Sequence, residues 1–282
     1  MKRKHESNEK SAEMKTPITR SRHRKVGFAT SVGKVRRVDE DSILAMDVGT
    51  AFLSEARSRL LLIVADGMGG HRRGDVASRI AVQTTQTTLL PLLTSKDDIA
   101  PATYYRELQA AFANANRAIL EEAKKSPDYE GMGTTLSIAV ADGHDLHVAN
   151  VGDSRVYIVN DQEICQVSRD HSLVQEMVDR GEIRPEEARH HPKKNVITRV
   201  VGYYGEVTPD IGFLKVVPGD MVLLCCDGLT NHVEDFQIQR VVAEASDPQQ
   251  ACEMLVAMAN EDGGTDNISV ILATAATIRS GE

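Results

Sequence analysis

Two apolar runs in this chain end in an aspartate that is followed by a glycine. They are residues 60–65, before Asp66 and Gly67, and residues 221–226, before Asp227 and Gly228. Six consecutive apolar residues predict a strand that is buried on both faces. A carboxylate at the end of such a strand loses its hydration unless a positive charge neutralises it, and the glycine leaves a backbone carbonyl free to face a ligand. The repeated pattern therefore predicts metal ions at the edge of a sheet.

Elsewhere the pattern alternates between helix-like and strand-like segments. Helical periodicity predicts one helix that begins near Gly74 and ends in the leucines before Pro91, and a second helix from Tyr104 to Ile119. The strand-like segments are 26–32, 43–46, 136–140, 146–148, 156–158, 211–217 and 268–272, and a later helical pair covers 238–242 and 251–258.

Turn residues separate several of these segments. Asp142-Gly143 and Asn160-Asp161 are typical of hairpin turns, and Pro218-Gly219-Asp220 marks another turn. Tandem helices, then hairpins, then helices again favour an α+β fold with mainly antiparallel sheets. Helix pairs on the outside of two stacked sheets give four layers.

Length and charge suggest one domain with a tail. The chain has 282 residues and 41% apolar content, and no linker-like stretch follows residue 25. Residues 1–25 hold nine Lys or Arg and three Glu, a net charge of +6, whereas the remainder carries −14. We expect a basic, disordered tail on an acidic domain over residues 26–276, with a short C-terminal tail at 277–282. Contact of the basic tail with nucleic acid is the alternative to simple solvation.

Nothing in the sequence suggests a membrane or secreted protein. No apolar run approaches the ~20 residues that span a bilayer, and residues 1–25 lack the apolar segment of a secretory signal. The four cysteines show no metal or disulfide spacing. Buried, reduced thiols in a cytoplasmic protein are the expected reading.

Several carboxylates lie at predicted strand ends or turns. They are Glu40, Asp41, Asp66, Asp153, Asp227 and Asp266. If the fold gathers them, their mutual repulsion requires protonation or bound cations. Oxygen ligands suit Mg²⁺ or Mn²⁺ better than zinc. Taken singly, Asp153 and Asp266 are equally well explained as turn and capping residues.

Seven motifs, in order, resemble those of the metal-dependent Ser/Thr protein phosphatases of the type 2C (PPM) family, in their bacterial form. The motifs are Arg36-Arg37-Val38-Asp39-Glu40-Asp41, Asp66-Gly67-Met68-Gly69-Gly70-His71, Met132-Gly133-Thr134-Thr135, Gly152-Asp153-Ser154-Arg155, Asp170-His171-Ser172, Cys226-Asp227-Gly228 and Gly264-Thr265-Asp266-Asn267. Together they span residues 25–275.

The resemblance implies a four-layer αββα sandwich with two metal ions, and a weaker third ion, in a cleft at one end of the sheets. Asp66 would bridge the two ions and the Gly67 carbonyl would bind one of them. Asp227 and Asp266 would complete the coordination of the other ion. Glu40 and Asp41 would hold metal-bound waters or support the ligands without touching the ions. Asp153 would bind the weaker third ion, and Arg36 would clamp the phosphate.

The implied activity is hydrolysis of phosphoserine and phosphothreonine in proteins by a metal-bound hydroxide. Because the hydroxide attacks phosphorus, no protein nucleophile is required. The sequence also lacks the phosphate-binding loop of cysteine phosphatases. Two residues depart from the family pattern. Met68 stands where eukaryotic members carry the His proposed as general acid, which leaves the proton donor open; His71 is nearby, but a structural residue of the turn is the preferred interpretation for it. Asp39 stands where Asn is usual; it could tighten a metal, but it is expected to face water.

Residues 172–205 match the variable flap of the family. A basic run in this flap, from Arg189 to Arg199, is hypothesised to attract acidic phosphoprotein segments; a solvated loop is an equal alternative. The expected partners are phosphorylated proteins made by a Ser/Thr kinase, and the protein is expected to be a monomer. The rival functions are a catalytically silent phosphoprotein-binding signalling module and a metal-dependent nuclease, and the acidic domain disfavours the latter.

Overall fold

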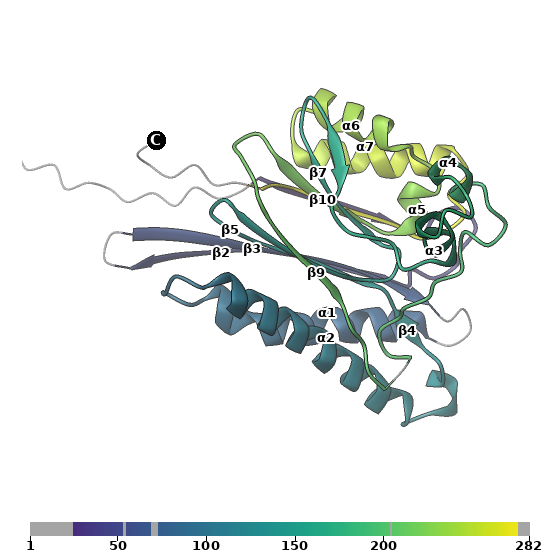
Figure 1. Ribbon diagram of the computed structural model, residues 1–282, viewed down its shortest axis with the longest axis horizontal. Coiled ribbons are helices and arrows are strands. Elements are labelled where there is room, and N and C mark those ends of the chain that lie inside the picture. Colours follow the sequence, from purple (N-terminus) through teal and green to yellow (C-terminus); the bar gives the residue numbers. More distant parts are fainter. Residues whose placement is uncertain (1–24, 53–54, 69–72, 204, 276–282) are drawn as a thin grey trace, which may run out of the picture.

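Two stacked antiparallel sheets with helices on both outer sides form the molecule (Figure 1). The computed structural model describes residues 25–52, 55–68, 73–203 and 205–275. The predicted tails lie outside these ranges except for Lys25. The strands are β1 (Val26–Ser31), β2 (Asp41–Phe52), β3 (Glu55–Met68), β4 (Gly133–Thr134), β5 (Leu136–Asp142), β6 (Asp145–Val151), β7 (Arg155–Val159), β8 (Ile164–Gln166), β9 (Asp210–Lys215), β10 (Met221–Cys225) and β11 (Ile268–Thr274).

The helices fall into an early pair, a middle group and a late pair. They are α1 (Gly74–Leu93), α2 (Pro101–Ala123), the 3₁₀ helix η2 (Pro127–Tyr129), α3 (Leu173–Asp179), α4 (Pro185–Ala188), α5 (Asp227–Thr230), α6 (Asp235–Glu244) and α7 (Pro248–Glu261). In Figure 1 the early pair covers one face of the sandwich and the late pair covers the other. The predicted αββα sandwich is confirmed.

One sheet has the strand order β1–β11–β10–β7–β8 and the other β2–β3–β5–β6–β9, with β4 paired to β3. The last strand, β11, therefore lies between β1 and β10 and is antiparallel to both. The predicted hairpin turns at Asp142-Gly143 and Asn160-Asp161 are confirmed, since they join β5 to β6 and β7 to β8.

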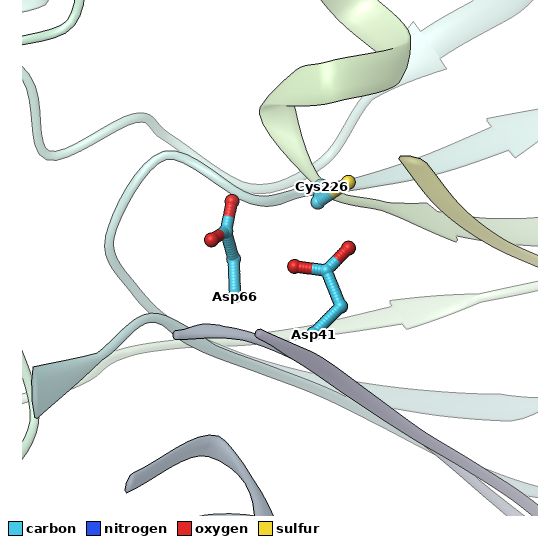
Figure 2. Close-up of side chains that lie close together, drawn as sticks. All are labelled: Asp41, Asp66 and Cys226. Carbon is cyan, nitrogen blue, oxygen red and sulfur yellow. The ribbon is translucent and has the colours of Figure 1, made fainter. Parts of the chain in front are cut away.

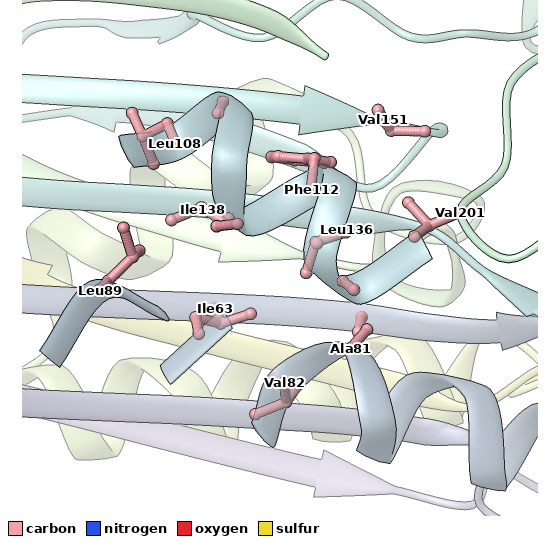
Figure 3. Close-up of a cluster of buried hydrophobic side chains, with 14 of the residues drawn as sticks. Ile63, Ala81, Val82, Leu89, Leu108, Phe112, Leu136, Ile138, Val151 and Val201 are labelled. Carbon is pink, nitrogen blue, oxygen red and sulfur yellow. The ribbon is translucent and has the colours of Figure 1, made fainter. Parts of the chain in front are cut away.

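Three layers of apolar side chains explain why both predicted runs are buried on two faces. Along β3, Leu61 and Ile63 pack toward α1 and α2, in the cluster shown in Figure 3. The intervening Leu60 and Leu62 pack between the two sheets. In β10, Leu223 likewise faces the late helix pair. The period-2 alternation of a strand thus supplies two different cores.

One helix end differs from the sequence prediction. Helix α1 does not end before Pro91 but continues through it to Leu93. Leu92 and Leu93 are buried against the sheet, and this burial outweighs the missing amide donor of Pro91. The predicted turn at residues 218–220 is confirmed; it joins β9 to β10, which belong to different sheets and do not pair. No helix among the described residues is long and apolar enough to cross a membrane.

Candidate metal centre

Asp41 and Asp66 face each other at one end of the sandwich. Asp41 is the first residue of β2 and is directly paired with Asp66 in β3. A ligand atom of each carboxylate and the Cys226 sulfur all lie within 4.8 Å of one another. Figure 2 shows both carboxylates in one space, with Cys226 across from them at the start of α5. The centre therefore lies at the seam between the two sheets.

The charges show that the other predicted aspartates lie near the same point. Burial raises the pKa of Asp66 well above its usual range, and the negative charges of its neighbours raise it further. Those neighbours are Asp41, Asp227, Asp153 and Asp266. Burial likewise raises the pKa of Asp41 to about 7, and the pKa values of Asp153 and Asp227 are also raised, mainly by burial. Five carboxylates from distant parts of the chain thus lie near one another. Four of them have poorly hydrated surroundings, whereas 32% of the Asp266 side chain is exposed.

The buried oxygen atoms test whether this region suits a cation. Both carboxylate oxygens of Asp41 and one of Asp153 are buried and form no hydrogen bond to any residue that the structure describes. Uncompensated buried carboxylate oxygens are costly. A hard divalent cation such as Mg²⁺ or Mn²⁺ takes oxygen ligands of this kind. The donor set therefore fits such an ion.

Asp66 is held by its backbone. Its amide donates to Thr135 Oγ1 at 2.9 Å, and its carbonyl accepts from the Thr134 hydroxyl and the Thr135 amide, both at 2.9 Å. The next residue, Gly67, donates its amide to the Glu40 carbonyl at 3.1 Å. A Cβ on Gly67 would lie 2.4 Å from that carbonyl oxygen, so only glycine fits. The motif that contains the two threonines therefore fixes the direction of Asp66.

Asn267 joins the loop before β2 to the start of β11. Its Oδ1 accepts from the Glu40 amide at 2.8 Å, and its Nδ2 donates to the carbonyls of Val32 and Val38 at 3.1 and 3.0 Å. Glu40 also accepts from the Gly74 amide, at 3.1 Å, at the N-terminus of α1. This network sets the loop that carries Arg36 and Glu40 beside the strand that follows Asp266.

Arg36 reaches the centre from that loop. Its Nη2 lies 2.7 Å from Oδ2 of Asp266, and 45% of the Arg36 side chain is exposed. The guanidinium thus stands at the solvent side of the acidic cluster, where a planar set of donors can meet a phosphate group.

Asp227 occupies the first turn of the short helix α5. Its Oδ2 accepts from Asn231 Nδ2 at 3.0 Å, one turn later. Gly228 packs against the residue that precedes β11: a Cβ on Gly228 would lie 1.9 Å from the Asn267 carbonyl oxygen. The glycine of this second aspartate-glycine pair is therefore required by packing.

Asp153 lies in the connection that crosses from β6 in one sheet to β7 in the other. Gly152 has a φ of 109° and donates its amide to His171 Nδ1 at 3.2 Å. That bond leaves the proton of the neutral ring on Nε2, which lies 3.1 Å from an Asp210 oxygen. Burial lowers the pKa of His171, so it stays neutral near pH 7. It holds the turn that presents Asp153.

The prediction that Cys226 is a buried, reduced thiol is confirmed, but its place beside Asp41 and Asp66 was missed. Its sulfur accepts from the Ser269 amide at 3.1 Å and donates to the Asn267 carbonyl at 3.3 Å. Burial raises its pKa well above the usual range, so it is a neutral thiol. Asn231 was missed as well. The only signal for it was its spacing of four residues after Asp227.

Asp39 does not simply face water, which corrects the prediction for this residue. Its carboxylate accepts from the Thr30 hydroxyl at 3.0 Å and from the Asp41 amide at 3.1 Å. It therefore shapes the backbone just before β2. Met68 is the last residue of β3 and pairs with Gly133 of β4. His71, the histidine near Met68 in the sequence, lies outside the described residues.

A cleft of about 620 Å³ opens beside the centre, between residues 172–205 and the α5–α6 region. Asp153 and Asp227 line it, together with Arg189 and Lys194. Arg189 pairs with Glu234 at 3.0 Å, and Arg199 pairs with Asp210 at 2.6 Å. These two ion pairs neutralise the two arginines of the predicted basic run. The remaining positive charge of the run therefore comes from Lys193 and Lys194.

The chain matches known proteins along most of its length. A protein phosphatase 2C family model matches residues 47–261. The serine/threonine phosphatase stp of Listeria innocua is 36% identical over 250 residues, which cover 87% of this chain and 93% of that protein. The crystal structure of the serine/threonine phosphatase Stp1 from Staphylococcus aureus matches with a TM-score of 0.79 and 30% identity, over 92% of this chain and 98% of that one. The catalytic domain of the serine threonine protein phosphatase PstP, solved in complex with 2 manganese ions, matches with a TM-score of 0.74 and 33% identity, over 90% and 99% of the two chains.

Proposed function

The chain belongs to the protein phosphatase 2C family and is a protein-serine/threonine phosphatase, and we propose that its acidic cluster holds the divalent cations of that reaction. In this proposal Asp66 and the Gly67 carbonyl hold one ion, and Asp66, Asp227 and Asp266 hold the second. Asp41 and Glu40 act on the same pair directly or through water. Asp153 serves a third ion together with Asp227.

The observation that carries this proposal is the set of buried carboxylate oxygens, on Asp41 and Asp153, that form no hydrogen bond within the part of the chain that the structure describes. Divalent ions held by these residues would lower the pKa of bound water and so supply a nucleophile at neutral pH. The structure of PstP in complex with 2 manganese ions supports manganese as one of the metals used here; magnesium is the alternative.

The chain's own residues then orient the substrate. Arg36 presents guanidinium donors at the solvent side of the cluster, beside Asp266, and it would hold the phosphate oxygens during attack. Asn267 keeps the Arg36 loop in place through its two bonds to backbone carbonyls. Cys226, the cysteine beside the cluster, does not act as nucleophile, because burial raises the pKa of its thiol and keeps it protonated at neutral pH.

We further propose that the substrates are phosphorylated proteins made by a Ser/Thr kinase, that the protein works in the cytoplasm and that it is a monomer. The silent-module alternative is not supported, since the named relatives are phosphatases. The net charge of −14 outside residues 1–25 disfavours a nuclease. Deletion of residues 1–25, followed by a nucleic-acid binding assay, tests the remaining possibility of a nucleic-acid contact.

The direct test replaces Asp227. Hydrolysis of a phosphothreonine peptide in MnCl₂ should fall at least ~10²-fold in Asp227→Asn, because loss of a ligand charge weakens both metal binding and water activation. Asp161→Asn, the same change in an exposed turn, is the matched control and should retain wild-type activity. Equal rates in the two variants would contradict the proposed role of Asp227.

A further inference from the structure

A chain of two side-chain hydrogen bonds connects the segment 172–205 to Asp227. Lys194 Nζ donates to Asn231 Oδ1 at 2.8 Å. Asn231 Nδ2 donates in turn to Asp227 Oδ2 at 3.0 Å. Lys194 belongs to the predicted flap, and Asn231 is the residue that caps the C-terminus of α5. Both residues line the cleft, and the Asn231 amide joins the flap to α5.

The chemistry of the three groups fixes the orientation of that amide. An asparagine side chain has an accepting oxygen at one side and a donating nitrogen at the other. Lys194 can only donate, and an ionised Asp227 can only accept. A flipped Asn231 would place its oxygen against the carboxylate and its nitrogen against the ammonium, and both contacts would be lost. Lys194 therefore selects the orientation in which Asn231 supports Asp227.

The backbone around Lys194 holds this side chain in reach. The Lys194 amide donates to the His191 carbonyl at 3.0 Å, and the Val196 amide donates to the Lys193 carbonyl at 3.1 Å. Val196 is joined to Leu173 at the base of the segment by a bond of 2.8 Å. The position of Lys194 thus follows the conformation of the whole segment.

A second contact fastens the same segment to the same side of the cleft. Arg189 Nε lies 3.0 Å from Oε1 of Glu234, the residue that precedes α6. Both contacts belong to the wall of the cleft of about 620 Å³, since the residues that line it include Arg189, Lys194, Asn231 and Glu234, together with Asp153 and Asp227. The two contacts and the proposed metal ligands therefore border the same cleft.

We infer that Lys194 is a positioning residue that couples the flap segment to the metal centre by holding Asn231 against Asp227. This inference rests on the proposed role of Asp227 as a metal ligand. Its consequence is that the conformation of residues 184–196 sets how well Asp227 is oriented. Residues that hydrogen-bond to a metal ligand, without touching the metal, change the metal affinity in this way, because they fix the direction of the ligand atom.

Calorimetric titration of the full-length, chelator-treated protein with MnCl₂, without substrate, tests the coupling. Lys194→Met should raise the manganese dissociation constant about 5- to 10-fold, since one charge-assisted hydrogen bond is lost. Asn231→Ala should raise it about 10- to 100-fold. In the Asn231→Ala background, Lys194→Met should have a much smaller added effect, because the hydrogen-bonded connection from Lys194 to Asp227 is already broken.

Lys193→Met is the matched control. It removes the same charge from the adjacent, exposed residue and should leave the dissociation constant within about twofold of wild type. Lys194→Arg, which keeps a charged donor, should recover most of the affinity. Thermal unfolding of each variant in chelator separates loss of folding from loss of binding, and two-dimensional NMR of the Asn231 side-chain amide in the chelated protein should report its altered bonding in Lys194→Met.

Two outcomes would overturn the inference. Equal manganese affinity in Lys194→Met and Lys193→Met would mean that the bridge does not act on Asp227. Tighter binding in Lys194→Met would mean that Lys194 acts only as a positive charge that repels the ion. If the wild type itself takes up no manganese, or if Asp227→Asn binds it as tightly, the proposed metal centre fails instead, so the two failures are distinguishable.

Discussion

Replacement of Asp41 by asparagine should make the metal-free protein more stable at alkaline pH. Burial raises the pKa of Asp41 to about 7, against about 4 in an unfolded chain. Between these two values the folded state binds more protons than the unfolded state, so the free energy of unfolding falls as pH rises from about 4 to about 7 and then levels off. Asparagine has no charge to bury, so Asp41→Asn abolishes this part of the loss.

The expected size follows from the pKa difference. Each pH unit within this window is worth about 1.4 kcal/mol. Between pH 5 and pH 7, where the folded carboxyl begins to ionise, the penalty grows by about 3 kcal/mol. A comparison of the two pH values cancels any change in packing that asparagine introduces. For a chain of this size, 1 kcal/mol shifts Tm by about 2–4 °C, so the stabilisation by Asp41→Asn at pH 8 should exceed that at pH 5 by about 6–12 °C.

Thermal unfolding in EDTA at pH 5 and pH 8 measures this difference. Addition of MnCl₂ should stabilise the wild type strongly at pH 8 and stabilise Asp41→Asn much less, because the variant has lost the charge that the ion neutralises. Asp161→Asn provides the control for a neutralised aspartate at an exposed position. A pH-independent effect of Asp41→Asn would show that Asp41 ionises as freely in the folded protein as in the unfolded one, and the electrostatic account of the centre would be wrong.

Three further changes test the packing around the centre and the sheets. Gly228→Ala should destabilise the protein by about 3 kcal/mol or more, since its Cβ would meet the Asn267 carbonyl; a normal urea midpoint would contradict the close approach. Arg59→Met should cost about 3–5 kcal/mol in urea unfolding, because the buried guanidinium contacts Asp142 and the carbonyls of Ser95 and Asp97; a loss below 1 kcal/mol would refute its role. Cys226→Ser should stay close to wild type, whereas Cys226→Val should lose about 1–3 kcal/mol by leaving a buried amide and a carbonyl unpaired; equal stability of the two would count against the sulfur hydrogen bonds.

Local patterns in the sequence were sufficient for the strands that end at the centre. Leu60 to Ala65 are all apolar because alternate residues enter two different cores, and this makes the strand and its terminal aspartate recognisable. Asp41 is different. Its place opposite Asp66 depends on the register of β2 and β3, which no local pattern specifies.

The features that the sequence did not reveal all depend on contacts between distant segments. Pro91 predicts a helix end by its local chemistry, but the burial of Leu93 was not visible from the neighbouring residues. The turn at 218–220 could be identified, whereas the sheets that its flanking strands join could not. The spacing of Cys226 from other residues gives no sign of a metal site. Its sulfur lies near Asp66 only because the two sheets stack on each other.

The central position of β11 has a consequence for biosynthesis. Among the strands that the structure describes, this one comes last in the sequence, yet it fills the space between β1 and β10, and Asp266 lies two residues before it. A growing polypeptide on the ribosome therefore cannot complete the centre until residues 268–274 have left the exit tunnel. Until then β1 and β10 have no neighbour in common, so the phosphatase domain can become active only after nearly all of its own residues have been synthesised.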